Sequence, residues 1–520
     1  MKRQHVAVAL WLSTYALSCQ ALSPAQIDSA RFAGTLKEVV IFGSSSFGTV
    51  MKAYMQNVVC NNSGDYDEFW NDENGATFRA YSCTMPVANG YPVGTKLLVI
   101  KRDMGDSIYG VHQVALNTPG MTMVVNSTAC PEYNHEATPA AICLSREARI
   151  PTAGISDVDP YMFPRTYTVA GVAQQRVNYP DPATNDDVGN AWNPLTMQQL
   201  NELDVASVGQ TIFGVVVTKP LRDALQLAQG LPAGSEAEGD TPSLSSAFVT
   251  GVLSGFVRGG PQANYASWKS VTGASGDDAK KVVICRGTRG SGIQAVANAH
   301  FLKAAAASAH VPNDPVDSAL HDTAQGMLTP LASGQPAGVD GSPVPGVTVN
   351  EGSAATSIEY CLRTHTYDYA IAVLPRTRVA LLHGDYRFVR LDGALPRRSA
   401  ARVGAYPMVY TSTMQWRKIL NAPDAQTKSF LIGIRVNAVT SNKLALYGNT
   451  EAKDGLLASP HKWQVQTDTC GATTDLEDAL YGSCVERVDL GDTIYNPGVH
   501  IDNVHSAYWT SNAAPLHLVK

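Results

Sequence analysis

The sequence lacks the short patterns that usually identify an enzyme or a metal site. It has no Gly-x-x-x-x-Gly-Lys-Ser/Thr loop for nucleotide phosphates, no His-Glu-x-x-His pair for zinc, and no Gly-x-Ser-x-Gly turn of the α/β-hydrolases. It also has no Cys-x-x-Cys, which argues against zinc and thioredoxin-like chemistry. Asp157-Val158-Asp159 is not followed by the glycine and glutamate of a calcium loop. We therefore expect no catalytic residue, no cofactor and no metal.

Charge and long hydrophobic runs are also scarce. Charged residues make up 16% of the 520 residues, the net charge is −6, and no long basic run occurs. This composition argues against nucleic acid or an anionic membrane surface as the main partner. Beyond the N-terminal region no stretch approaches the roughly 18 apolar residues that a spanning helix needs, so we expect no membrane span.

The N-terminus has the pattern of an export signal. Lys2 and Arg3 precede a short apolar run over 6–17, and Cys19-Gln20-Ala21 offers a small-residue cleavage site. We expect residues 1–21 to be a signal peptide and the mature protein to be periplasmic or secreted. A lipoprotein signal with Cys19 acylated is the alternative, although the preceding Ala16-Leu17-Ser18 fits it poorly.

Cleavage of the signal would leave an even number of cysteines, as is usual in exported proteins with disulfides. Eight cysteines allow 105 pairings. Proximity in the sequence favours three local pairs and leaves one longer one. The expected pairs are Cys60–Cys83, Cys130–Cys143, Cys470–Cys484 and Cys285–Cys361.

Short apolar runs alternate with helix-like stretches along much of the chain. The first unit is a strand over 39–42, a serine-rich turn over 43–48 and a helix over 49–59. Further strands are expected over 96–101, 153–157, 211–217, 281–285 and 369–374, and further helices over 109–116, 221–229, 245–253 and 292–307. Such alternation predicts an α/β fold with mainly parallel sheets. Residues 61–92 and 309–347 are expected to be inserts.

Small polar residues follow several of these strands. Ser46, Ser107 and Asp157 each stand just beyond a strand, and Arg286–Ile293 forms a glycine-rich loop between a strand and a helix. Ligands of open α/β sheets collect beyond the carboxyl ends of the strands. Helix N-termini there offer free N–H groups and partial positive charge, and arginine offers a planar fork of donors. The pattern therefore predicts an anion site.

Asp157 would give such a site a preference. An ionised carboxylate only accepts hydrogen bonds. Monohydrogen phosphate still has a proton to donate at neutral pH, whereas sulfate has none. A carboxylate beside the anion therefore favours phosphate over sulfate.

Four segments in this order resemble motifs of the phosphate-binding proteins of ABC transporters, which are type II periplasmic binding proteins. Gly43–Phe47 resembles the first phosphate loop of that family, and Gly105–Val111 resembles its serine-bearing helix start. Gly154–Pro160 is similar to its Gly-Ala-Ser-Asp-x-Pro segment, and Arg286–Gly292 is similar to its Arg-x-x-x-Ser-Gly-Thr loop. The resemblance covers most of residues 37–415.

The resemblance implies a two-lobed type II periplasmic-binding-protein fold with disulfide-clipped inserts. Lobe I would take 22–212 and 396–520, and lobe II would take 213–395. The protein would hold phosphate or a related tetrahedral oxyanion between the lobes for ABC-type uptake, with a transporter permease as partner. The implied ligand contacts are Ser45, Ser46, Phe47, Ser107, Asp157, Arg286, Arg289, Ser291, Gly292 and Ile293.

Departures from the family pattern leave two alternatives open. Ile293 stands in place of a threonine, and Thr288 replaces an acidic residue. Arg286 lies one residue farther from Ser291 than in the family, so Arg289 could take its place. One alternative is a binding-fold protein that has lost its ligand and serves as an extracellular structural or interaction protein, with self-association. The other is a secreted hydrolase that uses one serine of 44–46.

Overall fold

The computed structural model describes most of the chain up to residue 438. The described residues are 21–61, 64–71, 77–160, 163, 166–169, 172–175, 195–253, 267–277, 280, 282–287, 290–301, 347–352, 355–364, 369–378, 385–402, 405–438 and 456–457. Residues 1–20 of the expected signal peptide, Arg289, and the expected pair Cys470–Cys484 lie outside this set.

A single large sheet organises the molecule. It has 13 strands, 11 of them in the order β14-β13-β15-β11-β18-β8-β1-β4-β3-β2-β6, while β16 and β19 also pair with β11. Its strands are β1 (Leu36–Gly43), β2 (Asp67–Trp70), β3 (Phe78–Thr84), β4 (Lys96–Arg102), β6 (Ala141–Ile142), β8 (Ala153–Ser156), β11 (Leu203–Thr218), β13 (Val282–Gly287), β14 (Val347–Gly352), β15 (Tyr369–Pro375), β16 (Tyr386–Phe388), β18 (Val409–Arg417) and β19 (Leu456–Leu457). Three small two-stranded sheets are formed by β5 (Gly120–Met123) with β7 (Arg146–Arg149), β9 (Thr166–Val169) with β10 (Val172–Gln175), and β12 (Ser243–Leu244) with β17 (Arg390–Leu391).

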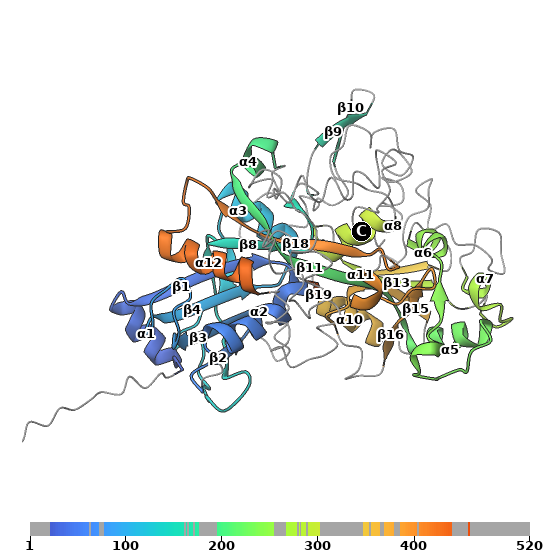
Figure 1. Ribbon diagram of the computed structural model, residues 1–520, viewed down its shortest axis with the longest axis horizontal. Coiled ribbons are helices and arrows are strands. Elements are labelled where there is room, and N and C mark those ends of the chain that lie inside the picture. Colours follow the sequence, from blue (N-terminus) through green and yellow to red (C-terminus); the bar gives the residue numbers. More distant parts are fainter. Residues whose placement is uncertain are drawn as a thin grey trace, which may run out of the picture.

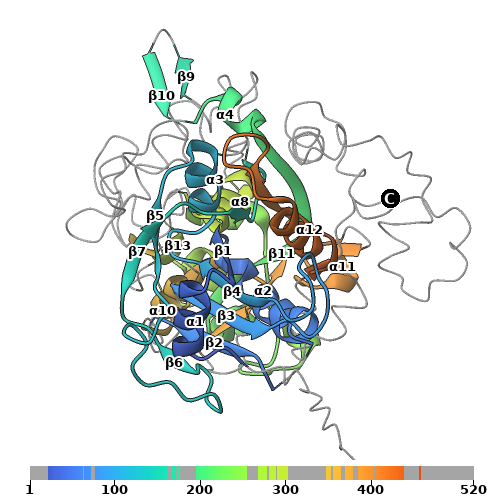
Figure 2. The ribbon, with the colours of Figure 1, turned by 90° about the vertical axis from the view of Figure 1, so that its left-hand side faces the viewer.

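Helices cover both faces of the sheet (Figure 1). They are α1 (Pro24–Phe32), α2 (Gly48–Tyr54), α3 (Ser107–Leu116), α4 (Met197–Asn201), α5 (Lys219–Ala228), α6 (Ser246–Leu253), α7 (Lys269–Thr272), α8 (Gly292–Phe301), α10 (Ala355–Thr364), α11 (Arg398–Arg402) and α12 (Ala425–Asn437). In two views at right angles, α8 and α10 lie on opposite sides of β13 (Figures 1 and 2). The expected α/β class is confirmed.

The sheet has two halves, which we name by their strands. The first half contains β8, β1 and β4, which are parallel, and continues into β3, β2 and β6. The second half contains β14, β13 and β15, which are also parallel. Strands β11 and β18 run antiparallel to their neighbours and join the halves. The parallel core expected in each part of the chain is thus present.

Strand β11 is longer than the sequence indicates. The apolar run predicts a strand over 211–217, but β11 begins at Leu203. Its first part, up to Ile212, pairs with β18, and its last part, from Phe213 to Val217, pairs with β15. Asp204, Val205 and Ala206 are only partly buried, so their pairing comes from β18 and not from an apolar pattern.

Alternation along β1 builds the core on both faces. Val40 and Phe42 pack in the same apolar cluster as residues of α3, whereas Val39 and Ile41 pack with residues of α2 and α12. Successive side chains of a strand point to opposite faces, and a parallel strand covered on both faces is apolar throughout. Residues 39–42 therefore belong to the sheet layer that lies between two layers of helices.

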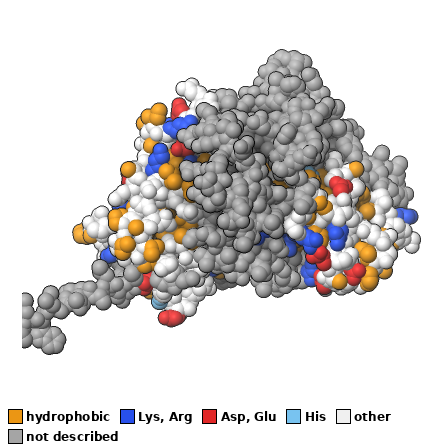
Figure 3. Space-filling view, viewed as in Figure 1, with side chains coloured by type: hydrophobic (Ala, Val, Ile, Leu, Met, Phe, Trp, Pro, Cys, Tyr) orange, Lys and Arg blue, Asp and Glu red, His pale blue; other side chains and the backbone are white. Residues whose placement is uncertain are grey.

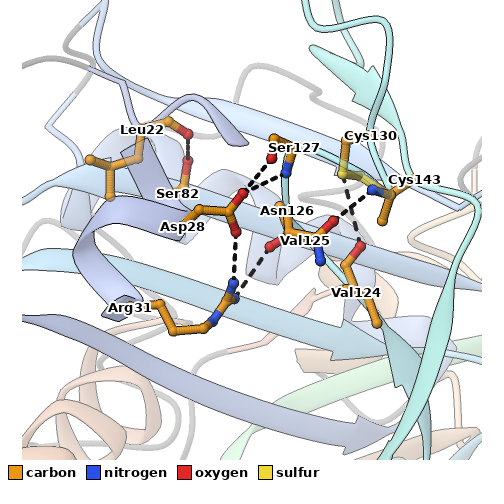
Figure 4. The surroundings of a disulfide bond; sticks show 11 residues. Leu22, Asp28, Arg31, Ser82, Val124, Val125, Asn126, Ser127, Cys130 and Cys143 are labelled. Atoms are coloured by element: carbon orange, nitrogen blue, oxygen red, sulfur yellow. Dashed lines mark hydrogen bonds and ion pairs between the residues drawn. A yellow bond between two sulfur atoms is a disulfide. The ribbon is translucent and has the colours of Figure 1, made fainter. Parts of the chain in front are cut away.

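Three of the four expected disulfides are present. Cys60–Cys83 ties the end of the helical segment that begins with α2 to β3, and Cys285–Cys361 ties β13 to α10. Cys130–Cys143 closes a surface loop near α1 (Figure 4). The expected insert over 61–92 also contains β2 and β3, which extend the sheet beside β4 because Phe69, Phe78 and Ala80 are buried in a third apolar cluster.

The visible surface carries charges of both signs. Figure 3 shows basic and acidic side chains together in the region of α5 and β16. Ion pairs there join Arg387 to Glu236 at 3.0 Å and Arg397 to Glu238 at 2.5 Å. Across the described residues, no helix has the length and apolar character needed to span a membrane.

Candidate anion-binding site

Five strand ends meet at one place between the two halves of the sheet. Strands β1, β4 and β8 of the first half are followed by Ser44–Phe47, by Asp106 and α3, and by Asp157. Strands β13 and β14 of the second half lead into α8 and α10. Because parallel strands end at the same edge of a sheet, the loops that follow them converge.

Three serine hydroxyls surround Asp157. Ser44 Oγ donates to one carboxylate oxygen at 2.6 Å, while Ser46 Oγ and Ser107 Oγ donate to the other at 3.1 and 3.4 Å. The backbone N–H of Asp157 donates in turn to Ser107 Oγ at 2.9 Å. All four residues are buried. The hydroxyls expected to face a ligand therefore bind a carboxylate of the chain itself.

Asp106 connects the two halves of the sheet. Its Oδ1 accepts a hydrogen bond from the N–H of Ser45 at 2.8 Å, and its Oδ2 accepts one from Ser291 Oγ at 2.6 Å. Ser45 follows β1 in the first half, and Ser291 follows β13 in the second. The side chain is fully buried, so this carboxylate takes up one donor from each side of the site.

Backbone contacts bring the halves together around these carboxylates. The N–H of Ile108 donates to the carbonyl of Gly290 at 2.9 Å, and the N–H of Ala355 donates to Ser45 Oγ at 3.2 Å. Gly292 lies so close to Ser107 and Asp157 that a Cβ on it would be 2.7 Å from the Asp157 carboxylate. A glycine is required here because the start of α8 approaches the first half directly.

Lys101 supplies a buried positive charge beside the site in the first half. Its ammonium donates to the carbonyls of Gly43, Ser44 and Arg102 and pairs with Asp103 at 2.6 Å. These bonds fix the loop after β1 and so position Ser44. The charge of Lys101 also acts on Asp106 and Asp157, where it favours the ionised carboxylate.

Burial makes both carboxylates weaker acids. Burial raises the pKa of Asp157 to about 7, the neighbouring charge of Asp106 adds to the rise, and the hydrogen bonds from Ser44 and Ser46 oppose it. Burial also raises the pKa of Asp106, against the hydrogen bonds from Ser291 and Ser45. Two carboxyl groups in one buried site disfavour each other's ionisation.

The structure brings together six of the residues predicted from the sequence. These are Ser45, Ser46, Ser107, Asp157, Ser291 and Gly292. The side chains of Phe47 and Ile293 are instead buried in apolar clusters, which leaves only their backbone toward the site. Arg286 is buried on β13, with Glu351 as its neighbour on β14.

Sequence reasoning missed Asp106, Lys101 and Ala355. Asp106 directly precedes the predicted helix start at Ser107, and a carboxylate at that point of an anion site was a signal that could have been used. Lys101 ends an apolar strand and so resembles an ordinary surface residue. Ala355 contributes only its backbone N–H, which no residue pattern identifies.

The site collects hydrogen-bond donors around two carboxylates of the chain itself. Its donors are hydroxyls and backbone N–H groups at the starts of helices. Those of Ser44, Ser45 and Ser291 donate to carboxylates, whereas the N–H of Ala355 donates to a hydroxyl. The hydroxyls of Ser44 and Ser46 donate to Asp157, and Ser45 Oγ accepts from Ala355. In the structure, Ser44 and Ser46 therefore act as hydrogen-bond donors and Ser45 Oγ acts as an acceptor.

Comparison with solved structures matches most of this chain to several proteins at low sequence identity. A Clostridium perfringens protein described as a phosphate ABC transporter substrate-binding protein, solved with bound phosphate, has 12% identity and a TM-score of 0.38, over 81% of this chain and 99% of that one. An ABC-type phosphate transport receptor from Vibrio cholerae has 12% identity and a TM-score of 0.34, over 79% and 98%. A phosphate-binding protein from Stenotrophomonas maltophilia has 14% identity and a TM-score of 0.36, over 80% and 92%.

No protein-family model matches the chain, and no curated protein sequence matches it.

Proposed function

We propose that the protein is a solute-binding protein that holds phosphate, or a related oxyanion that carries a proton, between two lobes. The convergence of hydroxyl and N–H donors from both halves of the sheet on buried carboxylates supports this proposal. Lobe I would comprise 22–212 and 396–520, and lobe II 213–395. After export through the signal over 1–21, the protein would deliver its ligand to an ABC-transporter permease, and it would catalyse no reaction.

The donors of the site suit an anion because each N–H or O–H group is held in position at the start of a helix. Ser45 N–H and Ser107 lie at helix starts of the first half, and Ser291 lies at the start of α8 in the second. A ligand that bonds to both sides at once stabilises the closed arrangement of two lobes. In such a closed arrangement, Arg286 and Arg289 would add positive charge from lobe II.

Asp157 would select for a protonated anion. Its carboxylate lies among the serine hydroxyls, where it could accept the proton of monohydrogen phosphate. Sulfate has no such proton, and its charge would face the carboxylate directly. We therefore expect phosphate to bind and sulfate not to compete.

Isothermal titration of the purified protein with phosphate tests the proposal. We expect a dissociation constant in the micromolar range, about −8 kcal/mol, and no heat from sulfate. Ser107→Ala should weaken phosphate binding on the order of tenfold or more because one bond to a charged ligand is lost. Ser270→Ala, on the surface helix α7, is the matched control and should leave binding unchanged. Absence of phosphate binding by the unaltered protein would refute the receptor assignment.

A second candidate function is a structural or interaction role without a ligand. It is favoured by one observation, namely that Asp106 and Asp157 already engage the serine donors of the site. Such a protein would show no heat with phosphate, sulfate or molybdate. Light scattering after gel filtration would then reveal self-association that increases with concentration.

A further inference from the structure

We propose that Asp106 is a built-in competitor of the ligand, a carboxylate of the chain that occupies the interlobe anion site and weakens the binding of a free anion. The inference rests on the proposed function and adds a residue that sets the affinity. It starts from the position of Asp106 between Ser45 N–H and Ser291 Oγ, at 2.8 and 2.6 Å. One carboxylate thereby bridges the two halves as a bound anion would.

Asp106 does not act as an ordinary helix cap. It stands at the N-cap position of α3, where an aspartate normally accepts a hydrogen bond from an N–H of its own helix. No such bond is formed, and both carboxylate oxygens point to residues outside α3. The side chain therefore forgoes local capping and instead contacts the loops after β1 and β13.

The backbone at Asp106 shows that this position is held under strain. Its φ of 58° and ψ of −150° lie in a region that is populated almost entirely by glycine. A non-glycine residue keeps such a conformation only when its surroundings fix it. The backbone N–H of Asp106 donates to Asp103 at 3.1 Å and its carbonyl accepts from Tyr109 at 3.2 Å, and the bonds of its carboxylate to Ser45 and Ser291 add to these contacts.

A free anion would have to displace this carboxylate. The Ser45 N–H and the Ser291 hydroxyl cannot each form a full hydrogen bond to two acceptors at once. Two buried negative charges also repel each other. Asp157 remains in the site as a second carboxylate with three hydroxyls bound to it. The apparent affinity is then the intrinsic affinity multiplied by the fraction of molecules in which Asp106 has left the site.

Two variants remove the competing charge while allowing the chain to fold. Asp106→Asn keeps the size of the side chain and removes its charge. Asp106→Gly removes the side chain and also suits the backbone, because glycine adopts this conformation without strain. Asp223→Asn, on α5, removes one negative charge from a half-exposed ion pair outside the site and is the matched control.

Isothermal titration with inorganic phosphate at pH 7 then measures the effect. We expect both Asp106 variants to bind phosphate on the order of tenfold to a hundredfold more tightly than the unaltered protein and the Asp223→Asn control. Small-angle scattering adds a second readout. Without phosphate the Asp106 variants should be more open than the unaltered protein, and phosphate should close them.

The outcomes separate this inference from the function on which it rests. If the unaltered protein binds phosphate and the variants bind it equally well or more weakly, Asp106 is not a competitor, while the receptor function stands. If neither the unaltered protein nor the folded Asp106→Gly variant binds phosphate, both proposals fail. Thermal melting shows whether each variant folds. If Asp106→Asn does not fold, the phosphate affinity of Asp106→Gly decides between these outcomes.

Discussion

Asp157 couples folding to pH. Its folded-state pKa of about 7 exceeds the value of about 3.9 expected in an unfolded chain, so the folded protein binds the proton more tightly. The resulting stability is fully present below about pH 4 and is lost as the pH rises toward 7. The burial of this side chain is the reason, because its charged form has no contact with solvent, and the hydrogen bonds from Ser44 and Ser46 offset this effect only in part.

We therefore predict that Asp157→Asn changes the pH profile of stability. The free energy of unfolding of the unaltered protein, relative to the variant, should fall between pH 4.5 and pH 7.5, since only the unaltered protein has this carboxyl group. Urea unfolding across that range measures the difference. A difference that stays constant with pH would show that Asp157 does not titrate in this way.

A second titrating pair lies away from the site. His135 Nδ1 lies 2.7 Å from the buried carboxylate of Asp67, which also accepts from the Tyr133 hydroxyl at 2.8 Å. The hydrogen bond with Asp67 raises the pKa of His135, and burial acts against this rise. For Asp67 burial is the largest cause and raises its pKa, while the bond from His135 lowers it. The His135 contribution to stability is thus present below pH 6.5 and lost at higher pH.

NMR titration should place the pKa of His135 above the ordinary value of about 6.5. In Asp67→Asn the pKa should fall, because the partner charge is gone. Glu136→Gln is the matched control, since it removes a neighbouring charge but leaves the hydrogen bond with Asp67 intact. Equal pKa values in the unaltered protein and Asp67→Asn would contradict the pairing.

At the scale of the element, apolar runs identify the buried strands well. The predicted run over 39–42 is the buried part of β1, and the runs over 96–101 and 369–374 correspond to β4 and β15. Strands β2 and β3 were not predicted, because their pattern mixes charged and apolar residues. They are stabilised by pairing with β4 and by the burial of Phe69 and Phe78, neither of which a local pattern reveals.

The same limit applies to the elements of the site. The serines and Asp157 could be predicted because they follow strands and resemble known motifs in order. The role of Asp106 depends on Ser291, which is 185 residues away in the sequence. The N–H of Ala355 is farther still from Ser45. Only the arrangement of the two halves brings these groups together.

The disulfide Cys285–Cys361 links two elements of the second half across 76 residues. A closed loop of this length restricts the unfolded chain strongly, so we predict that replacing both cysteines by alanine lowers the free energy of unfolding by about 2–4 kcal/mol. Urea unfolding measures the loss. Replacing Cys130 and Cys143, which are 13 residues apart, is the comparison and should cost less. A larger loss for the shorter loop would contradict the loop-length argument.

At the scale of the whole molecule, the approach of the two halves depends on Gly292. A methyl group there would meet Ser107 Oγ and the Asp157 carboxylate. We predict that Gly292→Ala holds the halves apart and weakens phosphate binding at least tenfold, on the proposed function. Calorimetry measures the affinity and small-angle scattering the opening.

Gly276→Ala is the control for this substitution, because a Cβ at Gly276 has no heavy atom within 4 Å. It should bind phosphate as the unaltered protein does. Unchanged affinity in Gly292→Ala would show that the contact between α8 and the first half is not needed for binding.

Strand β11 runs without a break from its pairing with β18 to its pairing with β15. Unfolding of either half would break its hydrogen bonds to β11 and expose the backbone of a strand that is also paired in the other half. We therefore expect cooperative melting in a single transition and not a separate transition for each half of the sheet. The amides of Ile212 and Phe213, at the point where the partners change, should be among the last to exchange with deuterium.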